Sequence, residues 1–327
     1  MQTTGPLLTV SNLRCDFKIH KKMVHAVRGV DLSIHEGEVL GVVGESGSGK
    51  SVTMKSIIRI LPDSAVVTAD ALSFAGEDLT HLSEKQYRHI RGNAISMIFQ
   101  DPMTSLNPLK RVGDHIVEVL QRHRHMDKKE AEAEAIEMLR KVGVPSPEQR
   151  VKQYPHEFSG GMRQRALIAM ALACNPKMLI ADEPTTALDV TIQAQILDLI
   201  RELQRENGMT VVLITHDLGV VASMCDRIAV MYCGLIMEQG TTDEIFYEPK
   251  HPYTKALLRS VPAINEETSE RLKPIEGQAP SVANPPPGCP FAPRCPIARP
   301  SCSEAIPDMV AYGEGHIARC PYGEEEA

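Results

Sequence analysis

A glycine-rich stretch beginning at residue 44 limits what this chain can fold into more than any other feature. The apolar run 39–43 before it predicts a buried strand, and residues 52–60 after it predict a helix. The stretch satisfies the phosphate-loop pattern G-x-x-x-x-G-K-[ST], since it reads Gly44, Glu45, Ser46, Gly47, Ser48, Gly49, Lys50 and Ser51. Such a loop points backbone N–H groups and a helix N-terminus toward phosphate oxygens.

The loop therefore predicts a bound nucleoside triphosphate. Lys50 would lie near the β- and γ-phosphates, and Ser51 would offer its hydroxyl to Mg²⁺. An ordinary loop is the alternative, because runs of Gly and Ser are common. The Lys-Ser ending, together with the strand before the loop and the helix after it, favours the phosphate loop.

Length and composition set the outer limits. With 327 residues, of which 43% are hydrophobic, the chain exceeds one typical domain, which predicts an ATPase body with an appendage. A net charge of −7 predicts no nucleic-acid partner. No apolar stretch is long enough to cross a bilayer, and residues 1–6 do not read as a secretory signal, so a cytoplasmic location is expected. In the cytoplasm disulfides are rare, so the eight cysteines are expected to be free thiols or metal ligands.

Hydrophobic spacing divides the chain into regions. Short strand-like runs dominate residues 7–99, and helical spacing dominates residues 113–143. After residue 160 strands alternate with a helix again, at 178–181, 191–205, 210–215 and 228–232, which predicts an α/β fold with a mostly parallel sheet. The composition changes beyond residue 249, with nine prolines between Pro274 and Pro300. We expect an ATPase domain over 1–248, an inserted helical subdomain over about 103–163, and a C-terminal extension over 249–327.

A second chemical feature is an apolar strand that ends in two carboxylates. Residues 177–181 lead directly into Asp182 and Glu183. In a phosphate-loop ATPase a carboxylate at this place holds the water shell of Mg²⁺, a role we assign to Asp182. Glu183 is placed to orient or deprotonate the attacking water. Taken alone, the same pair is typical of a simple strand-to-loop turn.

Another glycine-rich turn, with Ser159, Gly160 and Gly161, opens a helix and again presents N–H groups to an anion. One nucleotide does not need two such helix ends from one chain, so this turn is expected to cap a nucleotide held by a partner subunit. Here the chain resembles the ATP-binding subunits of ABC transporters, whose turn reads Leu-Ser-Gly-Gly-Gln. This chain departs from that pattern at Phe158 and Met162 but keeps Ser-Gly-Gly.

The resemblance implies a phosphate-loop core of the RecA type with an antiparallel β part, an inserted α-helical subdomain and, in this chain, a Cys-rich extension. It also implies roles for isolated residues. Gln100 would sense Mg²⁺ and water, and His216 would contact the γ-phosphate. Asp189, in the loop 187–189, would lie at the dimer seam, and Phe17 would stack on adenine. Capping for His216 and core packing for Phe17 are the alternatives.

Three longer stretches, residues 100–108, 154–158 and 251–258, resemble the ATPase subunits of oligopeptide and dipeptide importers. The resemblance implies a second, homologous ATPase subunit, two transmembrane permease subunits and an extracytoplasmic peptide-binding protein that acts through the permease. It further implies a peripheral position on the cytoplasmic face of a prokaryotic cell membrane. The permease is expected to dock close to Gln100.

Four of the eight cysteines fall near the C-terminus, separated by five, six and seventeen residues: Cys289, Cys295, Cys302 and Cys320. The spacing fits no common zinc or ferredoxin pattern. The segment holds too few apolar residues for a core of its own, which favours a metal staple. The resemblance to peptide-importer ATPases implies a [4Fe–4S] cluster on these cysteines, with zinc as the alternative and reduced, unliganded thiols as a third reading.

Competing functions make different demands on the sequence. A DNA-repair ATPase with the same Ser-Gly-Gly turn would show a long coiled coil or a zinc insertion and a basic patch, and neither is found. A ribosome-associated ATPase would carry two cassettes in one chain. A nickel or glutathione importer stays open, because substrate choice resides in other subunits.

Overall fold

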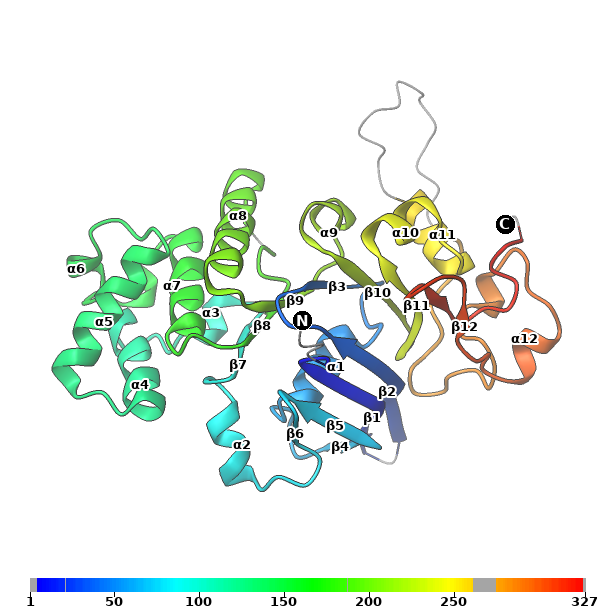
Figure 1. Ribbon diagram of the computed structural model, residues 1–327, viewed down its shortest axis with the longest axis horizontal. Coiled ribbons are helices and arrows are strands. Elements are labelled where there is room, and N and C mark those ends of the chain that lie inside the picture. Colours follow the sequence, from blue (N-terminus) through cyan, green and yellow to red (C-terminus); the bar gives the residue numbers. More distant parts are fainter. Residues whose placement is uncertain (1–4, 21, 187, 261–274, 326–327) are drawn as a thin grey trace. The chain divides into compact units, whose positions relative to one another are not determined.

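The computed structural model describes residues 5–20, 22–186, 188–260 and 275–325. The chain divides into two units, one formed by residues 1–80 with 215–327 and the other by residues 81–214. Figure 1 labels the helices and strands of both. No helix in the described ranges is long and apolar enough to cross a membrane.

The first unit contains an antiparallel sheet in the order β2-β1-β5-β6, with β4 also paired to β1. Its strands are β1 (Leu8–Ile19), β2 (Lys22–Ile34), β4 (Ala65–Thr68), β5 (Ala71–Phe74) and β6 (Glu77–Asp78). Alternation in β1 buries Leu8 and Val10, and then Leu13 and Cys15. The phase changes at Asn12, whose backbone is left-handed (φ 46°) and where pairing with β2 shifts register. This bulge keeps the apolar side chains on the core face.

A second set of strands in this unit leads to the phosphate loop. β3 (Val39–Val43), buried along its whole length, pairs in parallel with β10 (Arg227–Tyr232). β10 then pairs with β11 (Leu235–Thr241), β11 with β13 (Ile317–Ala318), and β13 with β12 (Val310–Ala311), all antiparallel. The helices are α1 (Lys50–Ile57), α9 (Leu218–Met224), α10 (Thr242–Tyr247), α11 (Pro252–Arg259) and α12 (Ser301–Glu304), with a 3₁₀ turn at Ala292–Arg294.

The second unit is built around three parallel strands, β7 (Ile95–Ile98), β8 (Met178–Asp182) and β9 (Thr210–Ile214), in which every residue is buried. Burial on both faces is typical of parallel strands flanked by helices. The helices are α2 (Glu84–Ile90), α3 (Pro102–Ser105), α4 (Val112–Arg124), α5 (Lys128–Lys141), α6 (Pro147–Arg150), α7 (Gly160–Leu172) and α8 (Val190–Asn207), with a 3₁₀ turn at Pro155–Glu157.

The expected α/β alternation is confirmed, with differences at the ends of elements. The helix expected over residues 52–60 begins earlier and ends at Ile57, because Arg59 adopts a left-handed backbone (φ 50°) that a helix does not accept. The helical stretch 113–143 consists of α4 and α5. They are separated where His125 turns left-handed (φ 55°) and the Asp127 side chain accepts N–H bonds at the start of α5.

The described residues beyond 249 contain more regular structure than their composition suggested, and they pack on β10 and β11. Phe291 is buried among three rings, with centroids 5.4 Å from Tyr253, 5.7 Å from Tyr232 and 6.1 Å from His251. Aromatic side chains provide a large apolar area for such contacts. This segment, which includes α11, therefore shares a core with β10 instead of forming one of its own.

A buried carboxylate ties the same segment to β11. Glu238, which is fully buried, accepts backbone N–H bonds from Lys250 (2.7 Å) and His251 (2.9 Å). Nε2 of His316 lies 2.8 Å from the same carboxylate. Burial lowers the pKa of His251 to about 4, so its Nδ1 stays an acceptor for the Tyr253 N–H. A buried charge with these partners is fully satisfied.

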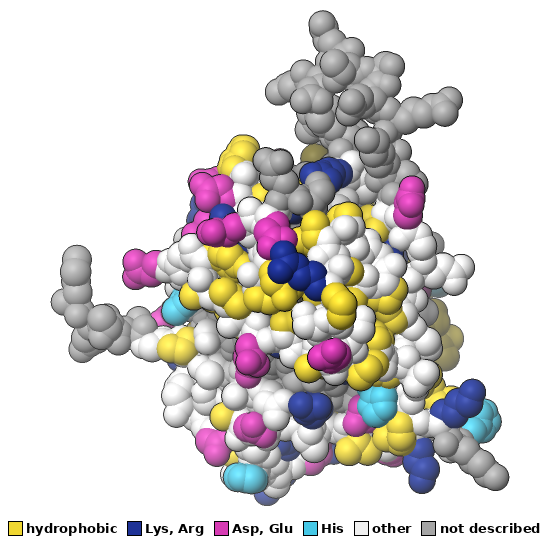
Figure 2. Space-filling model, turned by 90° about the vertical axis from the view of Figure 1, so that its right-hand side faces the viewer, with side chains coloured by type: hydrophobic (Ala, Val, Ile, Leu, Met, Phe, Trp, Pro, Cys, Tyr) yellow, Lys and Arg dark blue, Asp and Glu magenta, His cyan; other side chains and the backbone are white. Residues whose placement is uncertain are grey.

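The face on the side of this segment carries mixed charge. Figure 2 shows acidic and basic side chains interspersed there, with hydrophobic ones between them. A nucleic-acid surface would instead gather Lys and Arg into one field. On the described part of this face, Lys and Arg are not gathered into one field.

We expect Phe291→Ala to lower the free energy of unfolding by about 3–5 kcal/mol, because it empties a site among three rings. Tyr247→Ala removes a ring that is 82% exposed and should change the same quantity by less than about 0.5 kcal/mol. Denaturant unfolding followed by circular dichroism measures both variants. Equal stability of the two would show that Phe291 does not anchor this segment.

Candidate nucleotide site

The phosphate loop leaves β3 and enters α1 through backbone that only glycine fits. Gly44 has φ 146°, and a Cβ there would lie 2.1 Å from the carbonyl oxygen of Met231. Gly49 has φ 103°, and its Cβ would lie 2.6 Å from the carbonyl oxygen of Ala26. Both positions combine a left-handed backbone with direct contact against neighbouring main chain. The loop is thus held tightly between β10 and β2.

Lys50 stands at the start of α1 and turns back over the loop. Its ammonium donates to the carbonyl oxygens of Gly44 (2.7 Å) and Glu45 (2.9 Å) and lies 3.3 Å from Oγ of Ser48. The side chain is buried, with 6% exposed. The cation therefore sits inside the curve of the loop, where a phosphate anion would be attracted. Ser51 follows it in the first turn of α1.

Glu45 connects this loop to the C-terminal segment, a link that the sequence analysis missed. Its carboxylate pairs with Nη1 of Arg294, at 3.1 and 3.0 Å. Its backbone N–H donates to the hydroxyl of Tyr253 at 2.9 Å. Tyr253 belongs to the stretch 251–258 noted in the sequence, so that stretch was the one available signal. Nothing in the sequence pointed to Arg294.

In the second unit, a group of polar side chains meets at the end of β8. Asp182 is its last residue and is fully buried. Glu183 follows with φ 46°, a left-handed backbone that is strained for a residue with a Cβ. Its Oε2 accepts bonds from Nε2 of Gln100 (2.8 Å) and Oγ1 of Thr186 (2.9 Å). The structure therefore brings the side chains of Gln100 and Glu183 into direct contact.

The other predicted residues of this unit lie at the N-terminal ends of two helices. Ser159 caps α7, where its Oγ accepts the N–H of Met162 (3.3 Å), and Gly160 and Gly161 form the first turn. Phe158 is buried, so the departure from the family's Leu keeps an apolar anchor. Asp189 caps α8 by accepting the N–H of Ile192 (2.9 Å). The neighbouring position 187 lies outside the described residues.

Phe17 and His216 lie in the first unit. Phe17 is half-buried on β1, where it pairs with Val24 and Ala65, so it is not a fully enclosed core residue. His216 is exposed and precedes Asp217, whose side chain caps α9. Asp217, and not His216, therefore does the capping. The adenine and γ-phosphate roles of Phe17 and His216 stay predictions.

The prediction of a [4Fe–4S] cluster, or of zinc as its alternative, is wrong. Within the ranges that the structure describes, no group of three or more His, Cys, Asp or Glu side chains is arranged to hold a metal ion. The four cysteines of this prediction, none of which forms a disulfide there, are Cys289, Cys295, Cys302 and Cys320.

The physical reason is that the segment shares a core with β10, where Cys289 and Cys320 are buried and Cys295 and Cys302 are half-buried. Burial raises the pKa of Cys289 to about 11 and also raises the pKa values of Cys295 and Cys320, which favours neutral thiols. The contacts of Phe291 with the rings around it supply the stabilisation that a metal staple was expected to provide.

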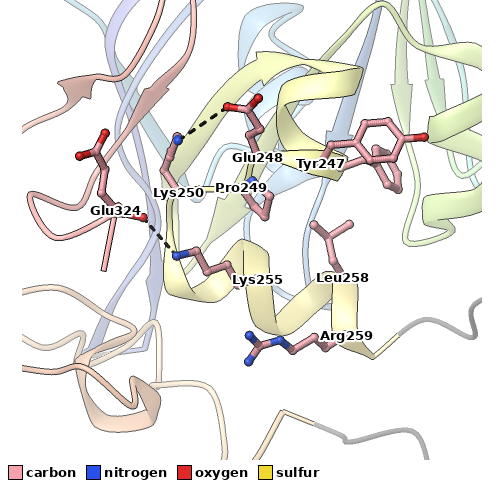
Figure 3. A pocket seen from close by; sticks show the side chains of 10 residues that line it. Tyr247, Glu248, Pro249, Lys250, Lys255, Leu258, Arg259 and Glu324 are labelled. Atoms are coloured by element: carbon pink, nitrogen blue, oxygen red, sulfur yellow. Dashed lines mark hydrogen bonds and ion pairs between the residues drawn. The ribbon is translucent and has the colours of Figure 1, made fainter. Parts of the chain in front are cut away.

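A hollow lies between α10, α11 and residues 323–324, with a volume of about 740 Å³ (Figure 3). Lys255 donates there to the carbonyl oxygens of Gly323 (3.1 Å) and Glu325 (3.0 Å). Lys250 pairs with Glu248 at 3.9 Å. Lys255 thus holds residues 323 and 325 in place, and we assign the hollow no ligand.

Comparison with protein families agrees with this arrangement. A family model described as "ABC transporter" matches residues 27–186, which contain the phosphate loop, Gln100, Asp182 and Glu183. A second model, described as "Oligopeptide/dipeptide transporter, C-terminal region", matches residues 237–302.

Curated relatives match over almost the whole length. The chain is 54% identical over 322 residues to the dipeptide transport ATP-binding protein DppD of Bacillus subtilis, covering 98% of this chain and 96% of that one. It is 52% identical over 314 residues to the oligopeptide transport ATP-binding protein OppD of the same organism, covering 96% and 88%.

Solved structures share the cassette. One is a dimeric ATP-binding cassette in a post-hydrolysis state, bound to ADP and Pi, with a TM-score of 0.64 and 28% identity over 72% of this chain and 98% of that one. Another is cbiO1 from Clostridium perfringens, part of an ABC transporter complex, with a TM-score of 0.62 and 28% identity over 75% and 92%.

Gly49→Ala should weaken ATP binding by at least about tenfold, because its Cβ would push the loop away from Ala26. Gly76→Ala is the matched control. It also places alanine in a left-handed backbone (φ 81°), but no atom lies within 4 Å of the new Cβ. Calorimetric titration of ATP into each full-length variant measures the affinity. A Gly49→Ala protein that binds ATP as tightly as the control would contradict the tight fit of the loop.

Proposed function

This chain belongs to the ABC transporter family, among the ATP-binding subunits that carry the oligopeptide/dipeptide transporter C-terminal region, and on that premise we propose that it hydrolyses ATP to drive uptake of dipeptides or oligopeptides. One observation carries the hydrolytic part: Glu183, directly after the buried Asp182, is held by Gln100 and Thr186. A general base needs such a fixed carboxylate beside the metal ligand.

The phosphate loop fits a triphosphate. Gly44 and Gly49 leave no room for side chains between the loop and the strands behind it, so the loop backbone itself would form the cradle. Lys50 supplies a buried cation, and Phe17 is assigned to the adenine ring. Ser51 and Asp182 are the residues that would hold Mg²⁺, which when bound neutralises charge on the phosphates.

Glu183 acts on water in this proposal. Its carboxylate accepts the proton of the attacking water, or orients that water toward the γ-phosphate. Gln100 and Thr186 hold the carboxylate in one orientation, and its strained backbone fixes the direction of the side chain. Gln100 is further assigned to Mg²⁺, and His216 to the γ-phosphate.

The chain is proposed to work with a second ATPase subunit. Ser159, Gly160 and Gly161 would cap the nucleotide held in the partner's phosphate loop, and Asp189 would lie at the seam between subunits. The solved cassette bound to ADP and Pi is dimeric, which supports this arrangement. Two permease subunits, an extracytoplasmic peptide-binding protein and a place on the cytoplasmic face of the membrane complete the proposal.

The domain organisation belongs to the same proposal. Residues 1–248 form the ABC ATPase domain, with the helices within about 103–163 as an inserted subdomain, and residues 249–327 form the C-terminal extension. Contacts of α4 with α5 and α7 support the helical subdomain. The family match over 237–302 supports the extension.

Glu183→Gln should retain ATP binding and lower the turnover of the reconstituted transporter by about 10²–10⁴-fold, because the amide cannot accept a proton from water. Glu132→Gln, an exposed residue paired only loosely with Lys128 (3.8 Å), serves as the control and should leave turnover unchanged. Phosphate release and peptide uptake in proteoliposomes are measured together. Full turnover of Glu183→Gln would remove Glu183 from its assigned role.

A further inference from the structure

The phosphate loop contains an acidic side chain, Glu45, beside the place where a triphosphate is expected. Unpaired, this carboxylate would repel the phosphates, and the repulsion between like charges grows where water is excluded. Of the eight loop residues it is the only acidic one. ATP binding therefore gains if the charge of Glu45 is neutralised and its direction is fixed.

Arg294 provides that neutralisation from 249 positions away in the sequence. Its Nη1 donates to both carboxylate oxygens of Glu45, at 3.1 and 3.0 Å, and its side chain is only 6% exposed. Charge-assisted bonds of this kind are stronger than neutral ones, and salt screens them little when they are buried. The carboxylate thus points toward the C-terminal segment.

The guanidinium of Arg294 is itself fixed. Its Nε donates to the carbonyl oxygen of Glu276 (2.9 Å) and its Nη2 to that of Ile275 (3.0 Å). Nη1 also donates to the hydroxyl of Tyr232 (2.9 Å), and the rings of Tyr232 and Phe291 lie 5.8 and 5.9 Å from the guanidinium carbon. These bonds fix the guanidinium of Arg294 in one position, so Arg294 sets the position of the Glu45 carboxylate.

Tyr253 holds the backbone of the same residue. Its hydroxyl accepts the N–H of Glu45 at 2.9 Å, and its ring is fully buried against Tyr232 and Phe291. Burial raises the pKa of this tyrosine, so it stays a neutral hydroxyl. The side chain and the main chain of Glu45 are therefore both attached to residues of the C-terminal segment.

We propose that the C-terminal segment is a positioning device for ATP binding: Arg294 neutralises Glu45 and holds its carboxylate toward the segment, and Tyr253 fixes the loop backbone at the same residue. Neither residue belongs to the phosphate loop, and both would act through their bonds to Glu45. The inference rests on the proposed function of the loop. It gives the segment a part in nucleotide affinity beyond its packing on β10 and β11.

The test measures ATP affinity of the full-length chain with Mg²⁺ by titration calorimetry. Arg294→Gln should weaken binding by about 10- to 100-fold, because it leaves Glu45 unpaired beside the phosphates. The loss should shrink at high ionic strength, since the unpaired charge is then screened. In a Glu45→Gln background, the Arg294→Gln change should cost less than about twofold, because the repelling charge is already gone.

Further variants separate positioning from folding. Arg294→Lys keeps the charge and should bind ATP more tightly than Arg294→Gln, and Tyr253→Phe should weaken binding by about 3- to 10-fold through loss of one hydroxyl. Arg299→Gln is the matched control: it lies in the same segment, pairs with Glu325 and stacks on Tyr322, and should leave the affinity unchanged.

The outcomes distinguish the two proposals. If the unchanged protein binds ATP and Arg294→Gln binds it equally well, the positioning role is overturned and the proposed function stands. If Arg294→Gln weakens binding as much in the Glu45→Gln background as alone, Arg294 acts only on folding and the inference fails. If the unchanged protein does not bind ATP, both proposals fall.

Discussion

The first unit depends on the direct contact of the phosphate loop with two neighbouring backbones. Gly44 lies against the carbonyl of Met231 on β10, and Gly49 against that of Ala26 on β2. Main chain on main chain leaves no tolerance for a side chain, so the loop cannot shift without moving a strand. The position of Lys50 follows from this, because its ammonium bonds to the carbonyls of Gly44 and Glu45. One geometric constraint thus fixes both the shape of the loop and the place of its cation.

Much of the fold and of the site could be predicted from the sequence, since those parts are encoded locally. The phosphate loop, the strand that ends at Asp182 and the helix that begins after Ser159 each occupy one short stretch. The bond between Gln100 and Glu183 joins residues 83 positions apart. Each residue could still be singled out from the sequence, because each follows a recognisable strand.

What could not be predicted depends on contacts between distant residues. The metal staple was expected because residues 249–327 hold too few apolar groups for a separate core. That reasoning did not consider a core shared with other strands of the chain. Phe291 reaches Tyr232 on β10, and a count of apolar residues does not reveal that contact. Arg294 was missed for the same reason, because no local pattern connects it with Glu45. The end of a helix that is set by a single left-handed residue, such as Arg59, also cannot be predicted from hydrophobic periodicity.

The hairpin of β12 and β13 has a consequence for solubility. Without it, β11 would be the outermost strand, with open N–H and C=O groups of the kind that templates edge-to-edge association between molecules. Loss of residues 310–318 would also take His316 from the buried carboxylate of Glu238. A copy of this protein truncated before residue 310 by a premature stop codon would therefore expose β11 as an edge strand. Such copies would aggregate through that edge.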